Sequence, residues 1–207
     1  MKNCLFVFFV GLLAISLTLP LSADIVVTAT QGSSGGQSFV RFEGGGSINT
    51  NQLSGVSGFS FNKGVQSASN FPQLNMGTDL AGNAIGYEVT GPNNFGTGSP
   101  FRLATSWTGP NVFSLRKGAD PNTKIYFVTA NNYASGSSLS ATIEFADTTF
   151  SELGMEANKS YQWDFSNGQK FVLETQNSFG DPGVPEPASG LVCAIFAGAL
   201  LTRIRRP

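Results

Sequence analysis

The sequence predicts an all-β protein, an antiparallel β-sandwich or jelly-roll-like domain that lies between two apolar terminal segments. Its middle part consists of short runs that are apolar or that alternate apolar with polar residues, as strands do when one face is buried. Clusters of Gly, Ser, Asn and Pro separate these runs. Between the terminal segments no long stretch has a helical period, although residues 150–155 fit a single helical turn. Regularly spaced short strands with polar turns are typical of sandwiches and jelly rolls.

The clearest strand signal is the alternation in residues 139–145, where Leu, Ala, Ile and Phe stand between Ser, Thr and Glu. Two later strands are joined across Asn167-Gly168, which is a strong signal for a tight hairpin. Phenylalanine is frequent throughout the middle part, enough to fill the space between two sheets. The expected strands are residues 38–42, 56–61, 85–89, 124–129, 139–145, 161–165 and 170–175.

The N-terminal segment, residues 1–23, has the three parts of a secretory signal peptide. Lys2 provides a positive start, residues 5–19 form an apolar run, and a proline with small residues leads to Ala23. We expect export through the Sec translocon and cleavage by signal peptidase between Ala23 and Asp24. The alternative interpretation is an uncleaved N-terminal anchor.

The C-terminal segment, residues 181–207, has three parts in a fixed order. A two-proline turn with one carboxylate comes first, and it is expected to be extended because proline fixes φ and restricts the residue before it. Residues 188–202 carry no charge and are expected to form a transmembrane helix, which is short against the ~20 residues of a comfortable span. A basic end then holds the C-terminus in the cytoplasm. The turn is Val184, Pro185, Glu186 and Pro187, and the basic residues are Arg203, Arg205 and Arg206.

This order of parts resembles the PEP-CTERM sorting signal, the substrate tag of the exosortase family of membrane proteases and transpeptidases. The similarity covers residues 184–207, with one departure, since Ala188-Ser189-Gly190 replaces the Ser-Thr-Leu type of continuation. It implies that an exosortase recognises and removes the tail and that the protein reaches the surface or extracellular matrix of a Gram-negative-type bacterium. A plain C-terminal membrane anchor is the alternative interpretation.

A looser similarity extends over the middle of the chain. Short pieces of it recur in many exported proteins that carry PEP-CTERM signals, and those proteins have no assigned activity. The similarity implies a β domain and does not imply a reaction. The pieces are residues 45–49, 95–98, 141–145 followed by 150–155, and 161–164 with 171–173.

Composition limits what the exported domain, residues 24–180, can do. Residues 24–183 carry 12 acidic and 8 basic residues, so a nucleic-acid partner is not expected. Cys4 and Cys193 both lie in the terminal segments, so the domain has no disulfide. The sequence contains no histidine, which excludes Ser-His-Asp and Cys-His catalysis and imidazole metal sites. We expect no enzyme, no cofactor and no metal.

Four carboxylates close in sequence invite a catalytic interpretation. Asp147, Glu152, Glu156 and Asp164 include the paired carboxylates that glycoside hydrolysis requires. The alternative is that they are solvated charges on turns and strand faces, which we favour because proximity in sequence does not make a cleft.

The two tryptophans are candidates for stacking on sugar rings. Trp163 shares a strand face with Tyr161 and Phe165, which predicts a core position. Trp107 stands beside Gly109-Pro110 and is the better candidate for a carbohydrate-binding surface, with a core position as the alternative.

Two oxygen-rich turns could hold Ca²⁺ weakly. Asp79 with Asn83 forms one, and Asp120 with Asn122 forms the other. Neither has a recognised calcium-loop spacing, so ordinary Asx turns are the expected structure.

Together these observations lead us to expect an exported cell-surface or matrix protein that is associated with exopolysaccharide, for example in a biofilm, and acts structurally or by adhesion. The alternative is a carbohydrate-binding module for exopolysaccharide. A carboxylate-dependent glycoside hydrolase is the third candidate.

The first testable prediction concerns the mature N-terminus. The exported protein should begin at Asp24, because the small residues before it fit the peptidase. Val27-Thr28-Ala29 offers a second candidate cleavage site. N-terminal sequencing of secreted protein measures the outcome, and a start at Met1 would contradict the export hypothesis.

Overall fold

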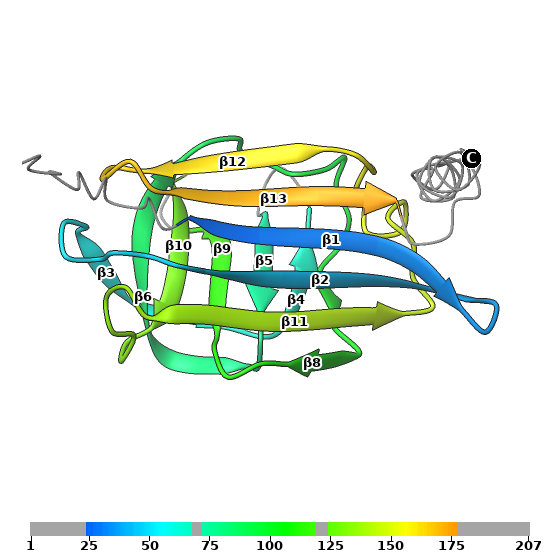
Figure 1. Ribbon diagram of the computed structural model, residues 1–207, viewed down its shortest axis with the longest axis horizontal. Helices are drawn as coiled ribbons and strands as arrows, with labels where there is room; N and C mark the ends of the chain where they lie inside the picture. Colours follow the sequence, from blue (N-terminus) through cyan, green and yellow to red (C-terminus); the bar gives the residue numbers. More distant parts are fainter. Residues whose placement is uncertain (1–23, 68–71, 119–123, 178–207) are drawn as a thin grey trace, which may run out of the picture.

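The computed structural model describes residues 24–67, 72–118 and 124–177 (Figure 1). In these residues the chain forms strands and turns and no helix, so the predicted all-β class is confirmed for them. Within that described part there is accordingly no helix long and apolar enough to cross a membrane. The expected signal peptide and transmembrane helix both lie outside the described residues.

The strands overlap every segment in which the sequence pattern predicted one, and several shorter strands add to them. Their bounds are β1 (Ile25–Ser34), β2 (Gln37–Ser47), β3 (Gly55–Phe61), β4 (Gly64–Gln66), β5 (Gln73–Met76), β6 (Leu80–Thr90), β7 (Arg102–Leu103), β8 (Ser106–Thr108), β9 (Phe113–Lys117), β10 (Ile125–Ala130), β11 (Ser138–Ala146), β12 (Ser160–Phe165) and β13 (Lys170–Asn177).

All strands belong to one hydrogen-bonded sheet with the order β7-β4-β5-β9-β10-β6-β12-β13-β1-β2-β11-β8, and β3 pairs with β6. The sheet is mixed, because β1 and β13 are parallel whereas the other pairs are antiparallel. It curls strongly into a half-barrel, so that β12, β13, β1, β2 and β11 lie across β6, β10, β9, β5 and β4 (Figure 1). The expected arrangement of two separate antiparallel sheets is thus replaced by two halves of a single sheet that enclose one core.

The two ends of the strand order are adjacent in the chain. β7 and β8 are separated only by Ala104 and Thr105. The backbone N–H of Ala104 donates to the carbonyl of Lys63, beside β4 (3.4 Å), and that of Thr105 donates to Glu144 in β11 (2.8 Å). Of these two neighbouring residues, Ala104 thus bonds to one end of the sheet and Thr105 to the other. This short connection keeps the two ends of the curled sheet close together.

Phe127 of β10 lies at the centre of the core and contacts both halves of the sheet. Its ring centroid is 6.0 Å from that of Phe113, 5.5 Å from Phe165 and 5.7 Å from Phe171. Phe113 comes from β9, beside Phe127, whereas Phe165 and Phe171 come from β12 and β13 across the interior. Burial of such rings stabilises the fold through apolar contact and edge-to-face geometry.

One end of the half-barrel is closed by the turn that follows β11. The turn has one hydrogen bond of the α-helical type, from Leu153 N to Thr149 O (3.2 Å), and one of the 3₁₀ type, from Gly154 N to Ser151 O (3.0 Å), but it forms no helix. The carbonyl of Leu153 accepts hydrogen bonds from the buried hydroxyls of Ser67 and Ser99, both at 2.8 Å. Gly154 O accepts from Thr97 N at 2.7 Å. Two of the recurring sequence pieces therefore contact each other, and their role here is to build the fold.

A second prediction concerns the start of the central strands. Gly46 has φ +137°, and a Cβ added there would lie 2.1 Å from the backbone carbonyl of Asp24. Gly35 in the β1–β2 turn also has positive φ (+60°), but nothing lies within 4 Å of its added Cβ. Gly46→Ala should therefore lower the free energy of unfolding by at least about 2 kcal/mol more than Gly35→Ala does, since a backbone carbonyl cannot move aside. Urea unfolding of the two variants measures this, and equal losses would contradict the packing at Gly46.

Candidate functional site

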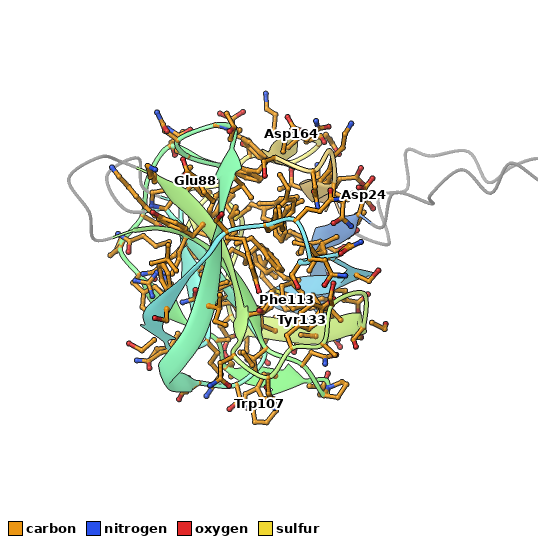
Figure 2. The ribbon with its side chains drawn as sticks, turned by 90° about the vertical axis from the view of Figure 1, so that its left-hand side faces the viewer. Asp24, Glu88, Trp107, Phe113, Tyr133 and Asp164 are labelled. Carbon is orange, nitrogen blue, oxygen red and sulfur yellow. The ribbon has the colours of Figure 1, made fainter. Side chains whose placement is uncertain are left out.

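Trp107, the sequence-predicted carbohydrate contact, lies at the surface of the sheet's edge. It is in β8, paired with Ile143 of β11, and the residue is 41% exposed. Ser106 and Thr108 on either side are also exposed. In Figure 2 Trp107 lies at the opposite side of the molecule from Asp164 and Glu88. A sugar ring can reach Trp107, although Trp107 lines none of three hollows of the described surface, which lie around Phe59, Glu88 and Asn111.

Trp163 occupies the core, as its shared face with Phe165 predicted. It is 0% exposed, and its indole N–H donates to the carbonyl of Pro92 at 2.9 Å. Its ring packs edge-on against Phe95 (6.3 Å) and Phe171 (5.8 Å). Trp163 therefore has no surface left for a ligand, and its polar atom is satisfied within the protein.

Three of the four carboxylates that sequence proximity singled out have separate local partners. Glu152 accepts hydrogen bonds from the backbone N–H (2.8 Å) and hydroxyl (3.0 Å) of Thr149, which lowers the pKa of Glu152. Glu156 lies 3.0 Å from the ammonium of Lys159 and raises the pKa of Lys159. Asp164 accepts from the side-chain amide of Gln162 at 2.7 Å.

The remaining carboxylate, Asp147, lies in the turn after β11 with φ 50°. No hydrogen bond or ion pair found in the described residues joins it to Glu152, Glu156 or Asp164. The described part of the chain also has no group of three or more His, Cys, Asp or Glu side chains that could hold a metal ion. The hydrolase hypothesis stays a prediction, since the paired carboxylates of glycosidases stand ~5–9.5 Å apart and do not bond to each other.

Of the two turns considered as calcium sites, one lies in the described residues and the other does not. Asp79 accepts a hydrogen bond from the backbone N–H of Lys63 (2.9 Å) and so fixes the segment before β4. Asn83 lies within β6. The second turn, with Asp120 and Asn122, lies outside the described residues.

The residues of the predicted targeting signals lie at the edge of the described residues or outside them. Asp24, the predicted mature N-terminus, immediately precedes β1, and its carboxylate accepts the backbone N–H of Lys170 at 3.0 Å. Ala23, the motif at residues 184–187 and the terminal arginines are outside the described residues.

The structure adds a feature that the sequence did not indicate, a groove on the outer face of β3, β6 and β10. It consists of two adjoining hollows of about 310 and 420 Å³ that share Val56 and Tyr126, and we call it the outer groove. Phe59 and Arg116 line the first hollow. The second is lined by polar residues that include Glu88, Lys124 and Asp164.

The apolar floor of the outer groove is a small second core. The Phe59 ring lies 5.2 Å from that of Tyr126 and covers Gly86, where an added Cβ would come within 2.5 Å of the ring. Tyr126 and Val128 of β10 are buried on this face, whereas Phe127 is buried in the main core. In the sequence, the continuous apolar run of β10 indicates that both faces of this strand are buried. Such a run does not show which part of the protein covers each face.

Charges of both signs surround the floor. The ammonium of Lys124 lies 2.7 Å from the carboxylate of Glu88, and Asp164 lines the same hollow. The guanidinium of Arg116 donates to the carbonyl of Ser60 and lies 5.9 Å from the Phe59 ring centroid. Burial lowers the pKa of Arg116. The groove therefore offers hydrogen-bond donors and acceptors beside an apolar surface.

Comparisons with protein-family models, curated proteins and solved structures gave no match for this chain. The functional argument therefore depends on the residues of this chain.

A third prediction distinguishes the two tryptophans by fluorescence. In Trp163→Phe the remaining Trp107 should emit at long wavelength and be readily quenched by acrylamide, because it is exposed. In Trp107→Phe the remaining Trp163 should emit at short wavelength and be protected. Trp163→Ala should also lower the free energy of unfolding by about 3–5 kcal/mol, and Trp107→Ala by at most about 0.5 kcal/mol. Similar quenching of the two tryptophans would contradict these placements.

Proposed function

We propose that this chain is an exported cell-surface or matrix protein, sorted through its C-terminal Pro-Glu-Pro signal by an exosortase-type enzyme, and that it acts structurally or by adhesion. The observation that carries the proposal is the coincidence of three features at the C-terminus. A two-proline turn, an uncharged apolar run and an arginine-rich end follow one another in residues 184–207. Each has a separate physical role in membrane insertion, orientation or access to a protease.

The strands of the described residues, from Ile25 to Asn177, belong to the part of the chain that the proposal places between the signal peptide and the sorting motif. The strands between them contain no cysteine, so the core provides the stability of the exported domain without disulfides. A rigid β domain of this kind suits a structural or adhesive role outside the cell.

Carbohydrate binding is the second candidate function. The exposure of Trp107 at a sheet edge favours it, because an exposed aromatic ring can stack on the apolar face of a sugar. A glycan array with the exported protein tests this function separately from sorting. The membrane, through the C-terminal helix, and exopolysaccharide are the further partners that the proposal implies.

A fourth prediction tests the sorting signal. Changing Pro185 and Pro187 together to Ala should let the apolar helix extend back through Glu186, so that the extended segment open to proteolysis is lost. The variant should accumulate in the inner membrane with its tail intact, whereas the wild type is trimmed and appears outside. Mass spectrometry of the C-terminus from each cell fraction measures the difference.

Pro182→Ala provides the matched control, since it removes a proline just outside the motif and should leave trimming unchanged. Deleting residues 203–207 should weaken membrane retention and orientation, because three positive charges no longer resist translocation. An intact tail on the wild type, in cells with a functional exosortase, would contradict the sorting proposal and leave a plain membrane anchor.

A further inference from the structure

The outer groove combines an apolar floor with paired charges, and this combination restricts what can occupy it. Val56 is 50% exposed and forms the part of the floor that both hollows share. Phe59 and Tyr126 continue the apolar surface beside it. Such a surface favours a ligand with flat C–H faces over one that is fully ionic.

The charges in the walls of the outer groove balance, so they give an ionic ligand of either sign no net attraction. Lys124 and Arg116 would attract an anionic chain, but Glu88 and Asp164 would repel it, and the reverse holds for a cationic chain. The acidic excess of residues 24–183 disfavours an anion further. A neutral ligand can bond to both kinds of group and needs no net charge in the groove.

Hydroxyl groups fit walls of this mixed kind. Each sugar hydroxyl donates one hydrogen bond and accepts two, so a neutral polysaccharide can donate to carboxylates such as Glu88 and Asp164 and accept from Lys124. Hydrogen bonds to charged groups are stronger than those between neutral groups. Since the two hollows adjoin at Val56 and Tyr126, a chain of linked sugars can occupy both.

We propose that the outer groove binds a neutral polysaccharide, with its rings packed on Val56 and Phe59 and its hydroxyls bonded to Glu88, Lys124 and Asp164. This inference gives a ligand class and a site to the adhesive role proposed above, and it rests on the export of the domain to where polysaccharide is found. The site differs from Trp107, which lies far from Glu88 and Asp164 in Figure 2.

Affinity electrophoresis of the full-length chain in mild detergent tests the proposal, with hydroxyethylcellulose, dextran or galactomannan in the native gel and alginate as the acidic probe. The test variant is Glu88→Gln with Lys124→Met, which removes an ion pair of 2.7 Å and leaves the net charge unchanged. The matched control is Arg41→Met with Glu144→Gln, which removes an ion pair of the same length between β2 and β11.

At least one neutral polysaccharide should retard the wild type, and the groove variant should bind it about tenfold more weakly, since charge-assisted hydrogen bonds to the ligand are lost. Val56→Glu should have the same effect, because it places a charge on the apolar floor. The control pair and Trp107→Ala should stay within about twofold of the wild type, as they lie outside the groove. Circular dichroism and urea midpoints confirm that each variant is folded.

Other results would overturn the proposal in distinguishable ways. Loss of binding only in Trp107→Ala would place the sugar on β8 instead of in the groove. Stronger retardation by alginate than by every neutral polymer would overturn the neutral class. No retardation of the wild type by any neutral polymer would overturn the groove proposal and leave the sorting proposal standing, because sorting is measured by the mass of the C-terminus.

Discussion

The structure depends on one constraint, which is that a single long sheet must bury its apolar face against itself. Strongly twisted sheets with this many strands curl or divide. Here the sheet curls, and its two end strands are held together by the covalent connection through Ala104 and Thr105. Phe127 contacts aromatic rings from both halves, so the curl of the sheet and the packing of the core depend on the same contacts.

The parallel pairing of β1 with β13 determines where the segments that we propose to be processed are attached to the domain. Because the two strands run in the same direction, Asp24 at the start of β1 and Asn177 at the end of β13 lie at opposite ends of the domain (Figure 1). Both strands are inside the sheet, with β2 and β12 on their other sides. The segments that we propose to be processed are therefore attached to the centre of the fold. The outer groove reaches β12 through Asp164, so it comes within one strand of β13 in the strand order.

The outer groove also shows how one strand can serve two surfaces. β10 places Phe127 in the main core and Tyr126 under the groove, so substitutions at neighbouring positions should affect different properties. Arg116 from β9 reaches the carbonyl of Ser60 in β3, which ties the rim of the groove to the sheet. The binding surface that we propose is fixed by the core in this way and is therefore preorganised, which limits the conformational entropy lost on binding.

The sequence by itself determined the features that local patterns encode. Alternation fixed the inward face of residues 139–145 and the buried position of Trp163, and composition with hydropathy defined the two terminal segments on which the sorting proposal depends. Only the tertiary structure decided how the strands pair. β4, β7 and β8 are too short to carry a period, and they are strands because distant partners supply their hydrogen bonds. The outer groove could not be predicted from the sequence either, since Val56, Glu88 and Asp164 come from separate strands that meet only through the pairing of β3 and β12 with β6.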